Sequence, residues 1–197
     1  MVLCPVPAKN GLPCRVMTVV IIGGSGSLGA ESVRQATAAG HPTAAAYTTK
    51  PANASEAAWH PLDLPDSKRV DAVLAEAGPH RVVNASSGRA EWTITAQGPV
   101  RPAMAAAKAA AKTGVLLVHP QAVVARTSLI IGDGRCEHER IVHELAAGNR
   151  DRVLFTDGIR CPVHVADPAA ALLELAPRDT TGIHRLAGPH AYGAVRD

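Results

Sequence analysis

The sequence is poor in aromatic residues: among 197 residues there are one Phe, two Trp and two Tyr. So few aromatic side chains argue against a stacking surface for single-stranded nucleic acid. The formal net charge is +3, and the charged residues are scattered without a block of Lys or Arg. This distribution points away from DNA and from anionic lipid surfaces. We therefore expect neither a nucleic acid nor a membrane as a partner.

Long hydrophobic runs and paired cysteines are also missing. No apolar stretch approaches the roughly 20 residues of a membrane-spanning helix, and the four cysteines form no CxxC motif, which is typical of a reduced, cytoplasmic protein. His138 and His143 are five positions apart, whereas two zinc ligands on one helix face need a spacing of about four. We expect no metal.

The first sixteen residues, MVLCPVPAKNGLPCRV, differ from the rest of the chain. They have two prolines among the first seven positions and no continuous apolar core, which argues against a secretion signal. Met17 directly precedes an apolar run, and we interpret it as the natural start. Residues 1–16 are then expected to be a disordered extension.

Strand-like and helix-like segments alternate through the remainder. Helices of about 10 to 15 residues between apolar strands favour right-handed βαβ crossovers, so we predict an α/β fold with a doubly wound parallel sheet of the Rossmann type. Gly40 should close the first helix, and Asp66 or Ser67 should cap the second. The predicted strands lie in MTVVIIGG, PTAAAYTTK, AAWHPLDL, HRVVNASS, AVVARTSLII, RVLFT, RCPVHV and GIHRLAG. The predicted helices are SLGAESVRQATAAGH, SKRVDAVLAEAG, residues 95–112, HERIVHELAAG and PAAALLELA.

The first predicted strand ends in a glycine-rich loop, GGSGSLG, which opens the first helix. Glycines permit a tight turn and the close approach of a diphosphate, while the helix N-terminus supplies N–H groups and a favourable dipole. A loop between a strand and a helix is the context in which this spacing indicates dinucleotide binding. The candidate cofactor residues here are Gly23, Ser25, Gly26, Ser27, Leu28 and Gly29.

The residues at the end of the second predicted strand indicate which dinucleotide the chain binds. A carboxylate about 20 residues after the loop would bind the ribose 2′-hydroxyl of NAD. The chain instead has Thr48, Thr49 and Lys50 at this place, and no acid before Glu56. Hydroxyls and a cation suit a 2′-phosphate, so NADP(H) is favoured over NAD(H).

Further segments follow in a fixed order: PLDLPD, VVNASSGRAEW, VVARTSLIIGDG, RCPVHVADPAAALLELA and TGIHRLAGP. Together with IIGGSGSLG, they resemble the extended short-chain dehydrogenase/reductases of the NAD-dependent epimerase/dehydratase superfamily, and among these the dTDP-4-dehydrorhamnose reductase group. The similarity covers residues 17–189, and the chain looks internally and C-terminally shortened. We divide it into a dinucleotide-binding Rossmann core, residues 17–132, and a reduced, partial substrate-binding lobe, residues 133–197.

The resemblance implies residue roles and a substrate class. In the family, the aspartate segment lies beside adenine and the VVNASS segment lines the dinucleotide. By resemblance these contacts carry over to Asp63, Leu64, Asn84, Ala85, Ser86 and Ser87. The resemblance also implies a nucleotide-sugar-like small molecule as partner and hydride transfer to a 4-keto sugar.

The catalytic Tyr-x-x-x-Lys pair of the family is missing. In the family, the tyrosine phenol exchanges a proton with the substrate, and the lysine one helical turn away stabilises the phenolate. Tyr47 is followed by Lys50 after only three residues, on a predicted strand. Tyr192 is followed four residues later by Arg196. Neither tyrosine provides the pair.

Two alignments of RPAMAAAKAAAKTGVLLVHP remain open. In the first, Lys108 is the family lysine, and Met104, which cannot transfer a proton, stands at the tyrosine position. In the second, GVLLVH replaces the fifth strand and His119 lies where the family has a hydroxyl residue. The tyrosine is absent in both, and Lys108 is the catalytic candidate.

These observations predict an NAD(P)-binding protein of the dTDP-4-dehydrorhamnose reductase type with weak or no activity. The alternative is a non-catalytic NADP(H)-binding sensor or partner subunit. Loss of a central strand would expose sheet edges and apolar helix faces. We therefore expect marginal stability or pairing with a second copy in a homodimer.

Overall fold

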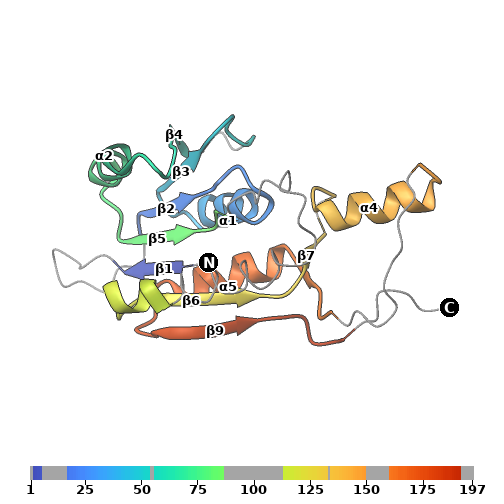
Figure 1. Cartoon of the computed structure of the whole chain (residues 1–197). Helices are drawn as coiled ribbons and strands as arrows, with labels where there is room; N and C mark the ends of the chain where they lie inside the picture. Colours follow the sequence, from blue (N-terminus) through green and yellow to red (C-terminus); the bar gives the residue numbers. More distant parts are fainter. Residues whose placement is uncertain are drawn as a thin grey trace.

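The computed structural model describes residues 2–5, 17–53, 56–86, 113–132, 134–149 and 160–191. Its centre is a seven-stranded sheet with the order β4-β3-β2-β5-β1-β6-β9 (Figure 1). The strands are β1 (Val2–Pro5), β2 (Val19–Ile22), β3 (Thr43–Tyr47), β4 (Ala58–Pro61), β5 (Arg81–Asn84), β6 (Val123–Thr127) and β9 (Gly182–Leu186). Two short strands, β7 (Ile130–Ile131) and β8 (Val163–His164), form a second parallel pair.

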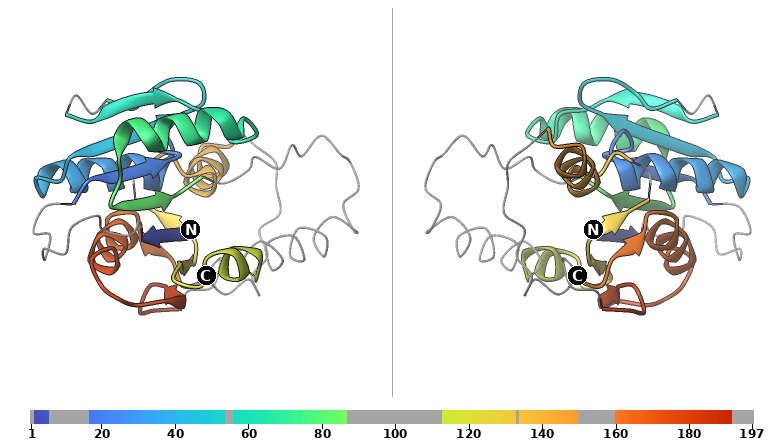
Figure 2. Two further views of the ribbon diagram at one scale, coloured as in Figure 1. Left: turned by 90° about the vertical axis from the view of Figure 1, so that its left-hand side faces the viewer. Right: turned by 90° about the vertical axis from the view of Figure 1, so that its right-hand side faces the viewer.

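Helices cover both faces of the sheet. The covering helices are α1 (Ser27–Ala38), α2 (Ser67–Ala77) and α5 (Ala166–Leu175), and a further helix, α4 (Glu137–Ala146), lies away from the sheet (Figure 1). Figure 2, which looks along the strands, shows α1 and α5 on one side and α2 on the other. This arrangement confirms the predicted α/β, doubly wound Rossmann-type fold. None of the helices in the described ranges has the length and hydrophobicity needed to cross a lipid bilayer.

The hydrophobic core lies on both faces of β2. Val19 and Ile21 pack with α1 and α5, where Leu172 is fully buried. Val20 and Ile22 face the opposite way and pack with Val73 of α2. A strand buried on both faces must be apolar at consecutive positions rather than at alternate ones. Burial of each such side chain contributes about 1.5–3 kcal/mol relative to exposure.

The helix ends follow the sequence prediction closely. Gly40, at φ 76°, follows α1, and the amides of Gly40 and His41 donate to Thr37 O and Ala36 O. These two bonds form a Schellman motif. At the start of α2, the carboxylate of Asp66 accepts a 3.0 Å hydrogen bond from the Arg69 amide. Of the two predicted N-caps, the structure therefore selects Asp66.

The N-terminal segment departs from the prediction. The sequence predicts disorder for residues 1–16, but Val2–Pro5 form β1 between β5 and β6, antiparallel to both. Without a fifth strand, β5 and β6 would each leave backbone groups unpaired at the centre of the sheet, and buried backbone groups require partners. The expectation is wrong for these four residues; the others of 1–16 lie outside the described residues.

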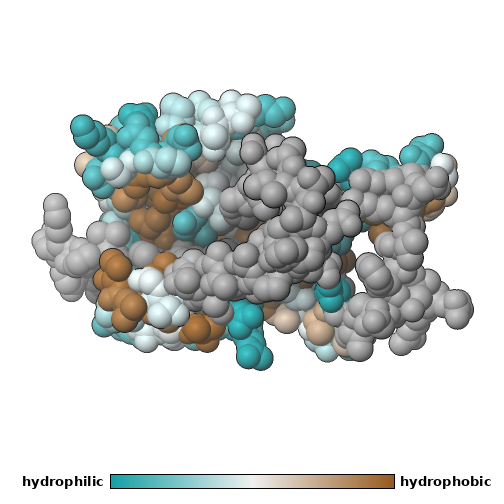
Figure 3. Space-filling model, in the orientation of Figure 1, coloured by the Kyte–Doolittle hydropathy of each residue, from teal (hydrophilic) through white to brown (hydrophobic). Residues whose placement is uncertain are grey.

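The segment GVLLVH does not form the fifth strand. Residues 113–118 are helical and lie on the opposite side of the sheet from α5 (Figure 2). The amide of His119 continues this turn by donating to Val115 O at 2.8 Å. Leu117 and Val118 are 76% and 88% exposed, and hydrophobic surface is visible over this segment in Figure 3. The alignment that made GVLLVH a strand, with His119 in the hydroxyl position, is therefore wrong. Met104, Lys108 and the expected helix over 95–112 lie outside the described residues.

Part of the expected substrate lobe belongs to the main sheet. β9 pairs with β6 in parallel, and α5 packs against α1. Gln35 of α1 also donates a 3.0 Å hydrogen bond to Ala166 O at the start of α5. Within residues 133–197, α4 is the described helix that stands apart from the sheet, beyond the carboxyl ends of the strands (Figure 1). The predicted strand RVLFT lies outside the described residues.

Candidate functional site

The glycine loop between β2 and α1 is packed so closely that it excludes side chains. A Cβ at Gly29 would lie 2.0 Å from Gly23 O, and one at Gly23 would lie 2.8 Å from the Ser86 backbone. Gly23 also has φ 79°, which favours glycine. The Gly26 amide closes the turn by donating to Gly23 O at 3.0 Å. Both the helix and the neighbouring strand β5 thus approach this turn through backbone atoms.

A fourth glycine, Gly24, has a packing role that the spacing pattern did not identify. Its amide donates to Ala46 O at 2.8 Å, and a Cβ there would lie 2.9 Å from the Ala45 methyl and 3.1 Å from the Trp59 ring. Trp59 in turn packs edge-on against Tyr47, with ring centroids 6.2 Å apart. The loop is therefore fixed on its second side by β3 and β4.

The end of β5 is ordered by its own side chains. The side-chain oxygen of Asn84 accepts hydrogen bonds from the amide and the hydroxyl of Ser86, at 3.0 and 2.5 Å. This short turn places the Ser86 backbone against Gly23. Because β2 and β5 are adjacent and parallel, their carboxyl ends meet at one point on the same edge of the sheet, beside the glycine loop. That point is where open α/β sheets bind ligands.

A cavity of about 680 Å³ opens beside the N-terminal half of α1. Its walls come from the glycine loop, the exposed face of α1, the loop between β3 and β4, and the segment before α4. The lining residues are Ser25, Ser27, Ala30, Glu31, Arg34, Thr49, Lys50, Pro51, Ala52, Asn53, Arg135 and Val165.

The described lining of this cavity carries three cations, Arg34, Lys50 and Arg135, and one carboxylate, Glu31. Arg34 donates to both carboxylate oxygens of Glu31, at 2.8 and 2.6 Å. These hydrogen bonds lower the pKa of Glu31, although its partial burial acts in the opposite direction. Glu31 therefore stays ionised and compensates Arg34. The remaining charge of the cavity is positive.

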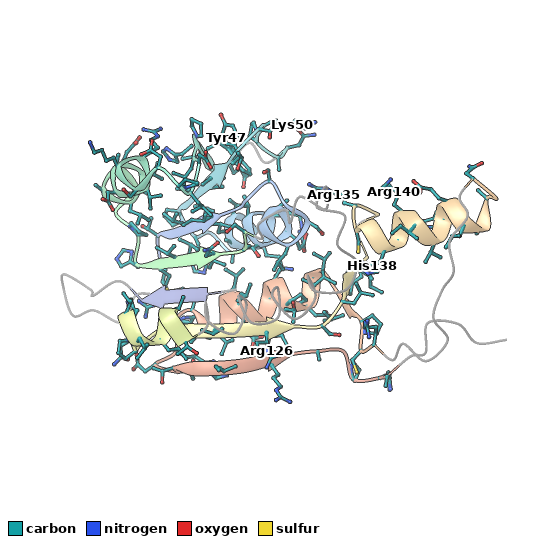
Figure 4. All side chains as sticks on the ribbon, in the orientation of Figure 1. Tyr47, Lys50, Arg126, Arg135, His138 and Arg140 are labelled. Atoms are coloured by element: carbon teal, nitrogen blue, oxygen red, sulfur yellow. The ribbon has the colours of Figure 1, made fainter. Side chains whose placement is uncertain are left out.

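Arg135 connects the cavity to the glycine loop. It donates a 2.7 Å hydrogen bond to Ser25 O across 110 positions of sequence. Figure 4 shows Arg135 and Lys50 beyond the carboxyl ends of the strands, where both line the cavity. The N-cap residue of α1 is Gly26, which has no side chain to cap the first turn. A helix N-terminus, small residues and nearby cations together form a site suited to phosphate groups.

The structure brings some of the predicted residues together and leaves others apart. Ser25, Ser27 and Lys50 line the cavity, joined by Thr49. Leu28 is buried, so only its backbone is available to a ligand. Thr48, Gly26 and the Asp63–Leu64 turn are exposed and are not among the residues that line the cavity. Lys108 and Ser87 lie outside the described residues.

Two cations of the cavity, Arg34 and Arg135, were missed by sequence analysis, for different reasons. Arg34 follows Ser27 by seven positions, and the spacing of Ser27, Ala30, Glu31 and Arg34 places them on one helix face. That periodicity could have identified Arg34. Arg135 had no such signal, because its contact with Ser25 depends on how the segment after β7 returns to the first half of the sheet.

Chemistry-bearing residues elsewhere are placed as follows. Tyr47 is the last residue of β3, and its ring contacts Trp59, so it does not stand on a helix before a lysine. His138 and His143 belong to α4. Among the described residues, no group of three or more His, Cys, Asp or Glu is arranged to hold a metal ion. Tyr192 lies outside the described residues.

The chain was compared with protein families, curated proteins and solved structures. The model of the NAD dependent epimerase/dehydratase family matches residues 19–144. A comparison with curated proteins gives no match. Among solved structures, the chain is similar to a putative epimerase from Burkholderia cenocepacia J2315, with 18% identity and a TM-score of 0.70 over 90% of this chain and 77% of that chain.

Two further structures have the same fold. One is the UDP-glucose 4-epimerase of Thermotoga maritima with UDP-glucose, at 12% identity and a TM-score of 0.73, covering 90% of this chain and 79% of that one. The other is the Bordetella bronchiseptica enzyme WbmG in complex with NAD, at 16% identity and a TM-score of 0.66, covering 95% and 77%. At these identities the similarity establishes the fold alone.

Proposed function

The chain belongs to the NAD-dependent epimerase/dehydratase family, and from this premise we propose that it binds NADP(H) at the glycine loop and the cavity beside α1. We further propose that it is of the dTDP-4-dehydrorhamnose reductase type, with weak or no catalytic activity. Residues 17–132 would hold the cofactor. The proposed cofactor residues are Gly23, Ser25, Gly26, Ser27, Leu28, Gly29, Thr48, Lys50, Asp63, Leu64, Asn84, Ala85 and Ser86.

The observation that carries the proposal is the contact between Gly29 and Gly23. A Cβ at Gly29 has no room, and this closeness brings the first turn of α1 to the mouth of a positively charged cavity. A diphosphate bound there would accept hydrogen bonds from backbone amides near Ser25–Leu28 and face the helix dipole. The fit rests on this chain's own geometry as well as on family membership.

The preference for NADP(H) rests on the charge of the cavity lining. Lys50 and Thr49 line it, and Glu31 is held by Arg34 rather than left available to a ribose hydroxyl. A 2′-phosphate gains from cations and loses beside a free carboxylate. The solved structures of WbmG and of the Thermus thermophilus UDP-glucose 4-epimerase contain NAD, so this preference distinguishes the chain from them.

The reaction proposed by lineage is reduction of a 4-keto nucleotide sugar, in which the nicotinamide would supply the hydride. The protein must then deliver a proton to the sugar oxygen. The sequence has only two tyrosines, neither of which precedes a lysine by four residues. Lys108 alone cannot replace the phenol. This absence favours weak turnover, or the alternative of a non-catalytic NADP(H)-binding sensor or partner subunit.

Titration of the protein with NADPH and NADH tests the cofactor proposal. We expect tighter binding of NADPH, and we expect Lys50→Ala to weaken NADPH by about tenfold, the equivalent of about 1.4 kcal/mol, with little change for NADH. Lys68→Ala, which removes an exposed lysine on α2, is the matched control. Equal losses for both coenzymes, or none, would contradict the assignment of Lys50.

A kinetic assay separates the reductase from the sensor. NADPH consumption is followed with a series of 4-keto nucleotide sugars at saturating coenzyme. We expect a rate near background, unaffected by Lys108→Ala. Robust turnover that Lys108→Ala abolishes would contradict the inactive assignment and establish Lys108 as catalytic.

We also propose a homodimer in the cytoplasm. Support comes from the exposure of Leu117 and Val118, at 76% and 88%, since neighbouring exposed aliphatic side chains are typical of interaction surfaces. Sedimentation of the native chain and of Val118→Asp tests this. The native chain should sediment as a dimer and the variant as a monomer.

A further inference from the structure

β1 lies inside the sheet and pairs with a different strand along each of its two edges. On one side Val2, Leu3, Cys4 and Pro5 pair with Asn84, Val83, Val82 and Arg81. On the other side Val2 and Leu3 pair with Val124 and Val123. Both pairings are antiparallel, whereas the other strand pairs described in this sheet are parallel. Figure 1 shows β1 running against its neighbours.

The space between β5 and β6 that β1 fills, which we call the β5/β6 slot, has two walls that do not pair with each other. β5 pairs with β2 on its far side, and β6 pairs with β9. Val83, Val123 and Val124 are at most 3% exposed, so this is an interior position where unpaired amides and carbonyls would be costly. An open strand edge binds an extended segment through its backbone.

One end of the β5/β6 slot touches the glycine loop. Val2 is in register with Asn84. The Asn84 side chain accepts both hydrogen bonds from Ser86, and the Ser86 backbone lies against Gly23. Pairing of β1 with the last residue of β5 therefore acts on the same turn that contacts the loop.

We propose that the β5/β6 slot is a strand-acceptor site, that its occupant is the segment Val2–Pro5, and that its occupation holds Asn84 and Ser86 against the glycine loop. The segment binds through main-chain pairing from a chain position remote from β6, so the same segment supplied as a separate peptide fits the slot. The coupling to dinucleotide affinity rests on the proposed function; the strand-acceptor site does not.

The test starts from the folded full chain. A protease recognition sequence is placed between residues 6 and 16, the chain is cut after folding, and a peptide of residues 1–8 with a fluorophore at its C-terminus is added. We expect saturable exchange of the labelled peptide for the cut fragment. A peptide with Leu3→Pro lacks one ladder amide and should bind about fivefold more weakly. Lack of exchange, or equal binding of both peptides, would overturn the strand-acceptor site.

A second measurement uses the uncut chain, so its result does not depend on whether the cut chain stays folded. Cys4 is in register with Val82, and Leu3 with Val83. Under oxidation, the Val82→Cys variant should show, in peptide mapping, a disulfide between Cys4 and the introduced thiol. The Val83→Cys variant should not link to Cys4, because neighbouring strand residues face opposite sides. No disulfide in Val82→Cys would overturn the assigned occupant.

NADPH titration of the same samples separates the two proposals. We expect the affinity for NADPH to fall when the slot is emptied and to return when the peptide fills it. Peptide exchange without any change in NADPH affinity would overturn the coupling. If the uncut chain fails to bind NADPH while the peptide still exchanges, the proposed function fails and the strand-acceptor site stands.

Discussion

The two halves of the sheet differ in the direction of their strands and in the part of the chain from which the strands come. In the half made by β2, β3, β4 and β5, all strands are parallel. Helix α1 connects the neighbouring strands β2 and β3, and α2 connects β4 to β5, which lies on the other side of β2. In the other half, β6 and β9 are parallel, but the strand that joins them to the rest is β1, which comes from the N-terminal end and runs the opposite way. The first half is assembled from local units, and the second depends on a remote segment.

Because of this difference, formation of the cavity and stability of the second half can be tested separately. The cavity takes most of its walls from the first half, with Arg135 and Val165 added from the second. The second half is joined to the first by the backbone pairing of Val2 and Leu3 with β6 and by the packing of α5 against α1. Substitutions can therefore be chosen that damage one half and report on the other.

The largest effect should come from Gly29→Ala in the first half. The new methyl would lie 2.0 Å from Gly23 O, so α1 must move away from the loop. We expect a loss of about 2–3 kcal/mol in the free energy of unfolding, measured by urea denaturation, and loss of NADPH binding. Gly26→Ala, whose Cβ would lie 3.3 Å from the same oxygen, should cost much less. Equal losses would contradict the close packing.

A smaller and regional effect is expected from Leu3→Pro. The substitution removes one ladder amide, with a net contribution of about 1 kcal/mol, at the centre of the β5–β1–β6 pairing. Amide hydrogen exchange should accelerate in β6 and β9 and remain slow in β3 and β4. Leu3→Ala keeps the backbone N–H and should leave the exchange rates of β6 closer to those of the parent chain. Uniform acceleration across the sheet would contradict the division into halves.

The smallest effect should come from Glu31→Gln, at a contact that links the halves. Glu31 accepts from Arg34 and from Gln35, and Gln35 reaches Ala166 O of α5. Because folding lowers the pKa of Glu31 below its ordinary value of 4.5, the carboxylate stabilises the fold above that pH, and the stabilisation is lost as the pH falls through the folded pKa. The melting temperature of the parent should exceed that of the variant at neutral pH.

The two melting temperatures should then converge in acid. High salt at neutral pH should also reduce the difference, since an exposed pair is screened. A constant difference from neutral pH to acid would contradict the role of the ionised carboxylate.

Local features of the fold could be predicted from the sequence. The buried β2, the Gly40 closure of α1 and the Asp66 cap of α2 each depend on residues within a few positions of one another. Features that depend on distant segments could not. β1 was missed because four residues that end in a proline carry no periodicity. One of the two open alignments made GVLLVH a strand because a short apolar run fits either a strand or a helix.

The candidate site divides in the same way. The close approach of Gly23 and Gly29 follows from their spacing before a helix. The position of Arg135 against Ser25 O follows from the path of a segment far along the chain, and the sequence contains no local trace of it. The electrostatics of the cavity were therefore predicted only at Lys50.

The two-sided pairing of β1 has a kinetic consequence. Leu3 pairs with both Val83 and Val123, so its docking place is incomplete until strands that are far apart in the chain have been brought together. Closing such long loops precedes any gain from the pairing. During folding, β1 should be the last strand to acquire protected amides, and the time before it docks is when β5 and β6 are open to pairing between molecules.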